Sequence, residues 1–353
     1  MRFLFIAPRF HTNQYGAVLS LLKHGHEVRF LVRTRGATEC HDRVTPVFLS
    51  GNLHTAVREY RGMLTSYAPD VIIIRGVGLR NVVFAWMGRM FTKRIILYTQ
   101  DPLYRRRDRA GRALVQKRLF NLVSRVRITP VLGPMDDRTF RMPHEYFVPF
   151  VVEPVEDAEN REYFRNGKVN ILSIGKFFLE RKNHLMLMQA IDEIRLTSPI
   201  RLTLIGSLNR EDDPHFMKIR GFIAERGLND IVSLKTNVPY RQCLQEYLSH
   251  DLFVLPSADE PAAVSPLEAM AHGLAVVCSD SDGARTYVQE NKNGFIFSPD
   301  SGGELRAKVT RAVSDRTLLA NMGREGARIA ASDYPLERYH AGLSQIISRE
   351  FSS

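Results

Sequence analysis

The sequence predicts an α/β protein built from two doubly wound parallel sheets. Three observations support this: 353 residues suit two domains, short apolar runs alternate with longer helical patterns, and this alternation starts afresh near residue 168. Strand–helix–strand units of this kind are right-handed and give parallel strands covered on both faces. With 44% hydrophobic residues, the chain can bury a core in each domain and is not disordered.

The first half of the chain contains five apolar or β-branched runs that we predict as strands. They cover residues 2–7, 27–32, 70–74, 94–98 and 125–129. The run at 70–74 is continuous rather than alternating, as expected for a strand buried on both faces. A helical pattern over residues 17–23 separates the first two runs.

The second half repeats this arrangement. Strands are predicted over residues 169–174, 201–205, 232–235, 252–255 and 275–278, with helices between them, one of them over 183–194. From residue 303 the pattern is helical and ends over 335–351. We therefore expect an N-terminal domain (1–150), an acidic, proline-bearing linker (151–167), a C-terminal domain (168–330), and a last helix (331–353) returning toward the N-terminal domain.

Charge is distributed unevenly between the two halves. Residues 1–150 carry 25 Lys and Arg against 10 Asp and Glu, whereas residues 151–353 carry 24 against 28. The N-terminal half is therefore expected to meet an anionic partner. Three distant cysteines indicate a reducing compartment without disulfides or a zinc cage. With no membrane-spanning run and no signal peptide, we expect a soluble cytoplasmic protein.

Arginines gather most densely over residues 105–118. This segment could bind anionic lipid headgroups or a lipid diphosphate acceptor, which would make the protein peripheral on the inner face of a membrane. The alternative is an ordinary solvated helix face. Nucleic acid is not expected as a partner, because no interleaved aromatics, finger spacing or RNA-binding signature accompanies the charge.

The segment 252–279 carries the most informative pattern. A buried strand leads into a loop with Asp259 and Glu260, and a short helix with Glu268 then starts near Pro266. Ser265 is predicted as the N-cap, so the helix start would offer unpaired N–H groups to an anion between two carboxylates. The alternative is that Ser265 and Glu268 form a simple capping box and Glu260 is a solvated loop acid.

This segment resembles the Glu-x7-Glu signature of the retaining glycosyltransferases of family 4, which have the GT-B fold of two Rossmann-like domains facing a cleft. The matching residues are Pro256-Ser257, Glu260, the run 266–271 with Glu268, Gly273 and the run 276–280. Residues 174–177 and 181–184 resemble the family's glycine and basic pair. The likeness is strong over residues 169–300 and thin over the N-terminal half.

The resemblance implies a nucleotide-activated sugar as donor, bound mainly by the C-terminal domain, and a hydroxyl acceptor on a glycan or lipid. Glu260 would contact the sugar, and Glu268 the ribose hydroxyls. The diphosphate would meet two sets of groups: the amides of Ala263, Val264 and Ser265, and the cations Lys176, Arg181 and Lys182. Fixed cations and a helix start can stabilise a departing diphosphate without a metal or other cofactor. The basic residues could also belong to a solvated loop.

Other candidate residues follow from the same resemblance. The nucleobase would lie near Gly206 and Val238, with the choice of base open. In the N-terminal half, His11 and Asn13 follow the first strand, where relatives place a glycine-rich loop; a plain surface histidine is the alternative. Gln100 and Asp101 follow the fourth strand, where many relatives have His-Asp. Asp101 would steer the acceptor hydroxyl, or serve only as an Asp-Pro turn residue.

The sequence departs from the family pattern at several positions. Ala262-Ala263 replaces a common Phe-Gly, Thr286 stands where many relatives have Glu, and Gln100 replaces His. These departures leave open a catalytically silent nucleotide-sugar-binding or partner protein, or a sugar-nucleotide epimerase of the same fold. The triplet Asp280-Ser281-Asp282 imitates a metal-binding Asp-x-Asp, but that motif belongs to a different, single-domain architecture, and we expect no metal site here.

Overall fold

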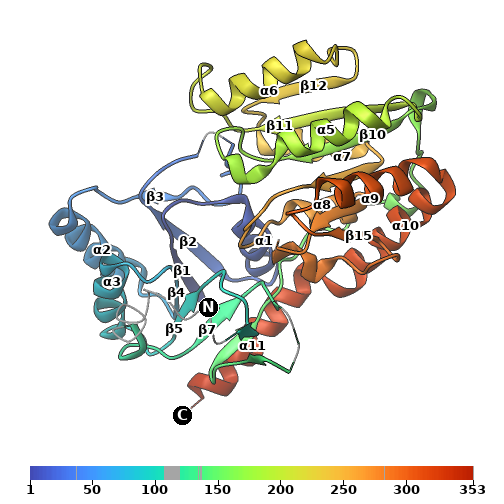
Figure 1. The fold of residues 1–353 in the computed structure, drawn as a ribbon. Helices are drawn as coiled ribbons and strands as arrows, with labels where there is room; N and C mark the ends of the chain where they lie inside the picture. Colours follow the sequence, from blue (N-terminus) through green and yellow to red (C-terminus); the bar gives the residue numbers. More distant parts are fainter. Residues whose placement is uncertain (37, 107–119, 134, 136, 282, 353) are drawn as a thin grey trace. The chain divides into compact units, whose positions relative to one another are not determined.

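A computed structural model describes residues 1–36, 38–106, 120–133, 135, 137–281 and 283–352. The chain divides into two compact units (Figure 1): unit 1 comprises Met1–Val151 and Leu336–Ser353, and unit 2 comprises Val152–Pro335. Each unit has its own parallel sheet, so the predicted two-sheet α/β fold is confirmed.

The sheet of unit 1 has the strand order β3-β2-β1-β4-β5-β7-β9, with all neighbours parallel. The strands are β1 (Arg2–Ile6), β2 (Glu27–Val32), β3 (Val47–Phe48), β4 (Val71–Arg75), β5 (Ile95–Tyr98), β7 (Arg127–Thr129) and β9 (Glu145–Phe147); β6 (Arg105–Arg106) and β8 (Thr139–Phe140) form a separate antiparallel pair. The order reverses between β1 and β4. Loops beyond the carboxyl ends of these two strands are where such sheets bind ligands.

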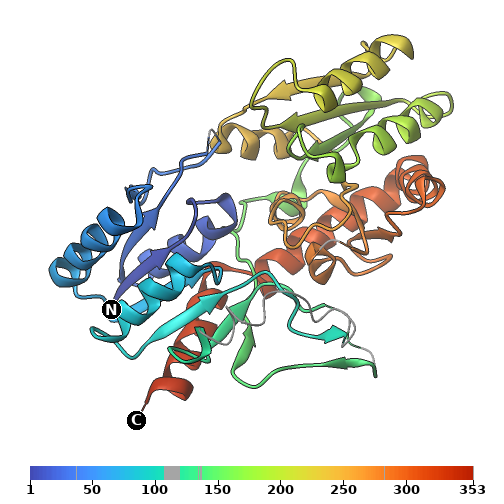
Figure 2. The same ribbon diagram turned by 60° about the vertical axis from the view of Figure 1, so that its left-hand side comes forward.

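Helices cover both faces of this sheet (Figure 2). They are η1 (Thr12–Gln14), α1 (Tyr15–Lys23), α2 (Leu53–Tyr67), α3 (Leu79–Arg89) and α11 (Leu336–Phe351). Leu4 and Ile6 of β1 share one core with Tyr60 of α2 and Phe84 of α3. On the other side, α11 packs on α1: the imidazole of His340 stacks on that of His24 with ring centres 3.9 Å apart.

The sheet of unit 2 has the order β12-β11-β10-β13-β14-β15, again parallel throughout. Its strands are β10 (Val169–Ile174), β11 (Ile200–Gly206), β12 (Val232–Thr236), β13 (Leu252–Leu255), β14 (Ala275–Ser279) and β15 (Gly294–Phe297). Here the strand order reverses between β10 and β13. The loops that follow these two strands carry the basic residues and the first acidic residue predicted from the sequence.

The helices of unit 2 are η3 (Ala158–Asn160), η4 (Arg165–Gly167), η5 (Glu180–Lys182), α5 (His184–Ile194), α6 (Pro214–Glu225), α7 (Tyr240–Leu248), α8 (Ser265–Ala271), η6 (Gly283–Tyr287), α9 (Gly302–Ser314) and α10 (Arg316–Asp333). One core joins Ile171 of β10 to Leu187 of α5, Ile219 of α6 and Val309 of α9. Helix α8 packs against α10, which also contacts β14.

The segment expected as a linker packs on unit 2 from Val152 onward. The guanidinium of Arg161 donates to the backbone oxygens of Tyr247 and His272, at 3.2 and 2.7 Å. The hydroxyl of Tyr163 donates to the oxygen of Gly273 at 2.8 Å. These bonds, which the composition of the segment did not reveal, tie it to the ends of α7 and α8.

Candidate functional site

The loop after β13 and the start of α8 differ in one detail from the sequence prediction. Val264, not Ser265, is the N-cap of α8, and no side chain caps the helix. The prediction of Ser265 as N-cap is therefore wrong, and the alternative of a Ser265–Glu268 capping box is not formed, because the carboxylate of Glu268 accepts from two tyrosine hydroxyls instead. The amides of Ala263, Val264 and Ser265 donate to no acceptor within the described part of the chain. They remain available to an anion or a sugar oxygen.

Glu260 lies in a cluster with both residues of the basic pair. One of its carboxylate oxygens accepts hydrogen bonds from Nη1 of Arg181 at 2.5 Å and from Nζ of Lys182 at 2.7 Å. Burial alone would raise the pKa of Glu260, but the charges and hydrogen bonds of Lys182 and Arg181 outweigh it and hold the pKa below its usual range. Glu260 is thus ionised, and the three side chains together carry one positive charge.

The sheet topology explains why these three residues meet. Lys182 lies in the loop after β10 and Glu260 in the loop after β13, and these parallel neighbours end at the same edge of the sheet. The amide of Ala258 also donates to the oxygen of Arg181 at 2.8 Å, which fixes one loop against the other. The side chain of Lys182 is 10% exposed, whereas that of Arg181 is 37% exposed. Arg181 is therefore the more accessible cation.

Lys176 lies in the same loop region, with its ammonium 5.5 Å from the centre of the Phe178 ring. The neighbouring Gly175 packs against the stem of Lys182: a Cβ at Gly175 would lie 3.2 Å from Cδ of the lysine. This close approach lets the loop fold over the basic pair. The structure therefore brings Arg181, Lys182 and Glu260 into contact and gives Lys176 a separate aromatic partner.

Glu268 is buried and held by two tyrosines of α7. The hydroxyl of Tyr240 donates to Oε1 at 2.6 Å, and that of Tyr247 to Oε2 at 3.1 Å. Burial raises the pKa of Glu268, and the two hydroxyl bonds counter this only in part. The carboxylate is thus lined by neutral hydroxyl donors, the kind of group a ribose would present. Nothing in the sequence analysis singled out these tyrosines, although Tyr240 directly follows the Val238-Pro239 pair.

The residues predicted beside the nucleobase end β11 and follow β12. A Cβ at Gly206 would lie 2.3 Å from the carbonyl oxygen of Gly175, so only glycine fits this close approach. Asn237 closes the other loop: its side chain accepts from the amide of Leu208 at 2.9 Å and donates to the oxygen of that residue. The backbone oxygen of Val238 accepts from the thiol of Cys243. Both positions lie at the carboxyl edge of the sheet.

Within the described residues, no group of three or more His, Cys, Asp or Glu side chains is placed to hold a metal ion. The backbone amide of Asp280 donates a hydrogen bond to the carbonyl oxygen of Phe297 at 2.8 Å. Its partner in the Asp-x-Asp motif, Asp282, lies outside the described residues.

In unit 1, His11 caps the short helix η1. Its ring nitrogen accepts from the amide of Asn13 at 3.2 Å, and the carbonyl oxygen of His11 accepts from the amide of Gln14. Asn13 is buried. These residues shape the loop after β1, beyond the carboxyl end of a central strand.

Gln100 and Asp101 follow β5 at the same edge. The side-chain oxygen of Gln100 accepts from Nη2 of Arg75 at 3.0 Å. Asp101 is fixed through its backbone: its amide donates to the hydroxyl of Thr99 at 3.0 Å, and its carbonyl oxygen accepts from Thr129. Arg75 was not predicted as a functional residue. The available signal was a single cation ending the apolar run of β4.

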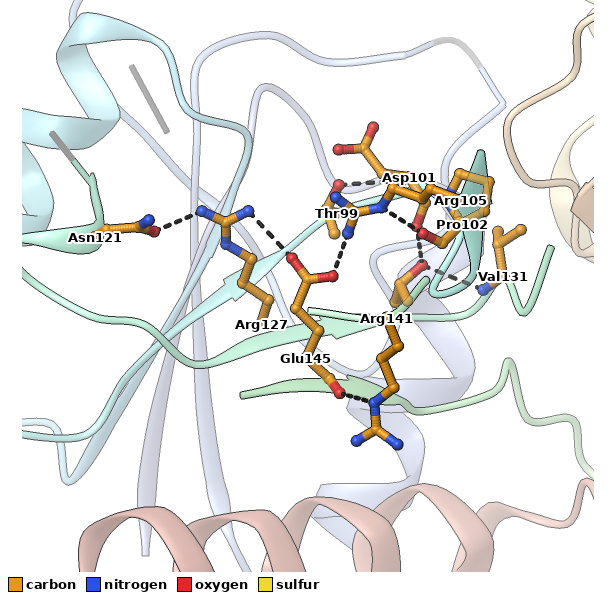
Figure 3. Close-up of polar contacts among 10 residues, drawn as sticks. Thr99, Asp101, Pro102, Arg105, Asn121, Arg127, Val131, Arg141 and Glu145 are labelled. Atoms are coloured by element: carbon orange, nitrogen blue, oxygen red, sulfur yellow. Dashed lines mark hydrogen bonds and ion pairs between the residues drawn. The ribbon is translucent and has the colours of Figure 1, made fainter. Parts of the chain in front are cut away.

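A buried ionic network lies beside this loop (Figure 3). Glu145, 3% exposed, accepts from Arg105 and from Nη1 of Arg127, the latter at 3.2 Å. Nε of Arg105 also donates to the oxygen of Pro102 at 2.7 Å. Arg105, at the start of the predicted basic patch, is therefore engaged in a contact within unit 1 that supports this loop. Residues 107–118 of that patch lie outside the described residues.

In the part of the chain that the structure describes, no helix combines the length and apolar character needed to cross a bilayer. Apolar side chains are nevertheless exposed around α3: Trp86 is 49% and Met90 76% exposed. Arg89 and Lys93 lie next to them in the chain.

Comparison with known proteins finds a family profile that matches most of unit 2. Residues 155–329 match the sequence profile of the family described as glycosyl transferases group 1. Over 129 residues the chain is 26% identical to the lipopolysaccharide core biosynthesis mannosyltransferase LpcC of Rhizobium leguminosarum bv. viciae, covering 36% of each chain. Over 232 residues it is 23% identical to the GDP-mannose-dependent alpha-(1-6)-phosphatidylinositol monomannoside mannosyltransferase of Mycobacterium tuberculosis (strain ATCC 25618 / H37Rv), covering 64% of this chain and 59% of the relative. The matches thus span about a third to three fifths of these relatives.

Among solved structures, Anabaena Alr3699/HepE in complex with UDP-glucose is similar, with a TM-score of 0.74 and 15% identity. The similarity covers 99% of this chain and 100% of that one. At this identity the comparison establishes the shared fold, two parallel-sheet α/β domains of the GT-B type.

Proposed function

We propose that the chain, whose residues 155–329 match the profile of the glycosyl transferases group 1, transfers a sugar from a nucleotide-sugar donor to a hydroxyl acceptor. The single observation that carries the proposal is the cluster of Glu260, Arg181 and Lys182 at the point where the strand order of unit 2 reverses. This is the place where open parallel sheets bind ligands.

The cluster suits the chemistry of a departing nucleoside diphosphate. When the bond between sugar and diphosphate breaks, negative charge grows on the phosphate oxygens. Fixed cations in a site shielded from water stabilise that charge without reorganising. Arg181 and Lys176 would supply such charge, together with the free amides of Val264 and Ser265. Lys182, nearly buried, would hold Glu260 ionised and oriented toward the sugar hydroxyls.

The nucleoside would extend across the same edge of unit 2. Glu268 would accept hydrogen bonds from the ribose hydroxyls, and the backbone near Gly206 and Val238 would contact the base. The Anabaena structure contains UDP-glucose, which supports a nucleotide sugar as the donor class. The curated relatives include an enzyme that uses GDP-mannose, so both uracil and guanine are candidate bases.

We further propose that the transfer retains the anomeric configuration and needs no metal or other cofactor. Gln100 stands where a proton-transferring histidine would be expected, and an amide cannot take a proton. In a front-face reaction the leaving phosphate accepts the proton of the acceptor hydroxyl, so that positioning suffices. Asp101 would steer the hydroxyl, and His11 and Asn13 would shape the acceptor side.

The acceptor would be a growing surface polysaccharide or a glycolipid. The names of both curated relatives point to such products, one in lipopolysaccharide core biosynthesis and one acting on a phosphatidylinositol mannoside. Exposed Trp86 and Met90, with cations beside them, support peripheral attachment to an anionic membrane surface on its cytoplasmic face.

The test is a panel of nucleotide sugars offered to the purified full chain. We expect binding of at least one nucleoside diphosphate, hydrolysis or transfer of the matching sugar in the presence of EDTA, and a product with the donor's anomeric configuration. Glu268→Gln should weaken nucleotide binding with little change in melting temperature. Tight donor binding without transfer to any acceptor in membrane extracts would instead indicate a catalytically silent protein.

A further inference from the structure

Arg75 is held rigidly at the carboxyl edge of the unit 1 sheet. It is the last residue of β4 and lies opposite Tyr98 of β5. The side-chain amide of Asn81 donates to the carbonyl oxygens of Arg75 and Gly76, at 2.8 and 3.0 Å. Because β4 adjoins β1 where the strand order reverses, Arg75 lies at the ligand-binding point of this sheet.

Among the described residues, the charge of Arg75 has no carboxylate partner. Its guanidinium donates one hydrogen bond, to the neutral amide of Gln100, and lies 5.7 Å from the centre of the Tyr98 ring. Within the described part of the chain, no Asp or Glu forms an ion pair with it. Burial lowers the pKa of Arg75, and the nearby positive charge of Arg9 lowers it further. An arginine nevertheless stays protonated at physiological pH.

Several other buried or partly buried arginines of this protein are paired with acids, whereas Arg161 and Arg80 form no ion pair among the described residues and donate instead to backbone carbonyl oxygens. Arg127 and Arg105 contact Glu145, Arg181 contacts Glu260, and Arg9 lies 3.6 Å from Glu39. Removing a guanidinium from water without a counter-charge is costly, so an unpaired example at a binding edge indicates that the anion comes from a ligand. The fork of N–H donors left on Arg75 matches a phosphoryl or carboxylate group.

We infer that Arg75, oriented by Gln100, is an anion subsite for the acceptor, so that the acceptor carries a phosphoryl or carboxylate group near the hydroxyl that receives the sugar. This inference rests on the proposed function, because it assigns the acceptor to unit 1. The inference also explains why Gln100 suits this position. Its amide oxygen accepts a hydrogen bond from Arg75, whereas a protonated histidine there would repel the guanidinium.

The test is a comparison of charged and uncharged acceptor analogues on the full chain. Binding of glucose 6-phosphate, mannose 6-phosphate and glucuronate is measured by NMR titration against glucose and mannose, with a nucleoside diphosphate present. We expect the charged probes to bind wild type about tenfold or more tightly than the neutral sugars. Arg75→Gln should remove this difference, and Arg75→Lys should restore part of it.

Arg29→Gln is the matched control, because Arg29 is an exposed cation in the middle of β2, away from the carboxyl edge. Retained preference in Arg75→Gln, or an equal loss in Arg29→Gln, would overturn the subsite. An equal loss of nucleoside diphosphate affinity in Arg75→Gln would assign the arginine to the donor and also overturn the inference. If wild type binds no nucleoside diphosphate, the proposed function fails, and the inference about the acceptor fails with it even where anion discrimination at Arg75 persists.

Discussion

The hydroxyl of Tyr240 donates a hydrogen bond to Oε1 of Glu268 at 2.6 Å. Tyr240 is the first residue of α7 and follows Val238-Pro239, so one side chain links the proposed base loop to the proposed ribose carboxylate. A carboxylate oxygen accepts two hydrogen bonds, so a ribose hydroxyl can join Tyr240 on Oε1 without displacing it. If Glu268 binds the ribose as proposed, Tyr240 would act on the donor through the orientation and ionisation of Glu268.

The pH dependence of donor binding follows from this bond. Burial raises the pKa of Glu268, and the Tyr240 and Tyr247 hydroxyls lower it in part. Tyr240→Phe removes one of these opposing bonds, so the pKa of Glu268 rises further. The ionised carboxylate is the form that would accept from ribose hydroxyls, so affinity for a nucleoside diphosphate should drop as the solution is acidified. We expect this drop to begin at a higher pH in Tyr240→Phe than in wild type. Calorimetric titrations between pH 5 and 8 would measure the shift.

Stability provides the control, because its pH dependence has the opposite sign. A glutamate whose pKa is raised in the folded protein favours folding at low pH, and this contribution is lost as pH rises through the folded value. Acidification should therefore enlarge the loss of affinity in Tyr240→Phe without unfolding the protein through Glu268, because the contribution of Glu268 to the free energy of unfolding is greatest at low pH. An affinity loss of the same size at every pH would point to simple misfolding of α7.

The ion cluster predicts a specific stability defect. Lys182 is nearly buried, and its ammonium is bonded to Glu260. Glu260→Gln would leave this cation without its counter-charge, and breaking a buried pair from one side costs about 3–5 kcal/mol. We expect a loss of that order in the free energy of unfolding, measured by urea denaturation. The double variant Glu260→Gln with Lys182→Met should recover most of it, whereas additive losses would contradict the pairing.

Much of the fold could be predicted because each main strand is an uninterrupted apolar run. The strands at 27–32, 169–174 and 252–255 coincide with the structure. The edge strands β3, β9 and β15 were missed; β3 and β9 have only two and three residues, which is too few to show a periodicity.

The candidate site could be predicted only where residues follow strands. Its place after a buried strand singled out Glu260, and the resemblance at residues 181–184 singled out the basic pair, but neither showed which contacts they form. The pairing of Glu268 with Tyr240 and of Arg75 with Gln100 joins residues 25 or more positions apart. The N-cap prediction at Ser265 failed because side-chain preference names a suitable capping residue but does not fix the backbone angles of its neighbour Val264.

The Glu145 network predicts a large loss of stability from one conservative substitution. Glu145→Gln would leave Arg105 and Arg127 without their shared carboxylate, beside the loop that carries Asp101. We expect the free energy of unfolding to fall by about 3 kcal/mol or more. Glu337→Gln is the matched control, because its pair with Lys23 is half exposed and is worth about 0–1 kcal/mol. Equal effects in urea denaturation would contradict a buried role for Glu145.

If α3 attaches the protein to a membrane, the contributions of charge and of apolar contact can be measured separately, the first by varying salt and the second by substitution. Binding to anionic vesicles should weaken as salt rises, since each nearby cation contributes about 1 kcal/mol and is screened within a Debye length. In flotation assays we expect the full chain to bind anionic vesicles and not neutral ones. Met90→Ser with Trp86→Ser should reduce recovery severalfold. Leu196→Ser, at an equally exposed leucine of unit 2, is the control; an equal reduction there, or equal recovery with neutral vesicles, would refute attachment through α3.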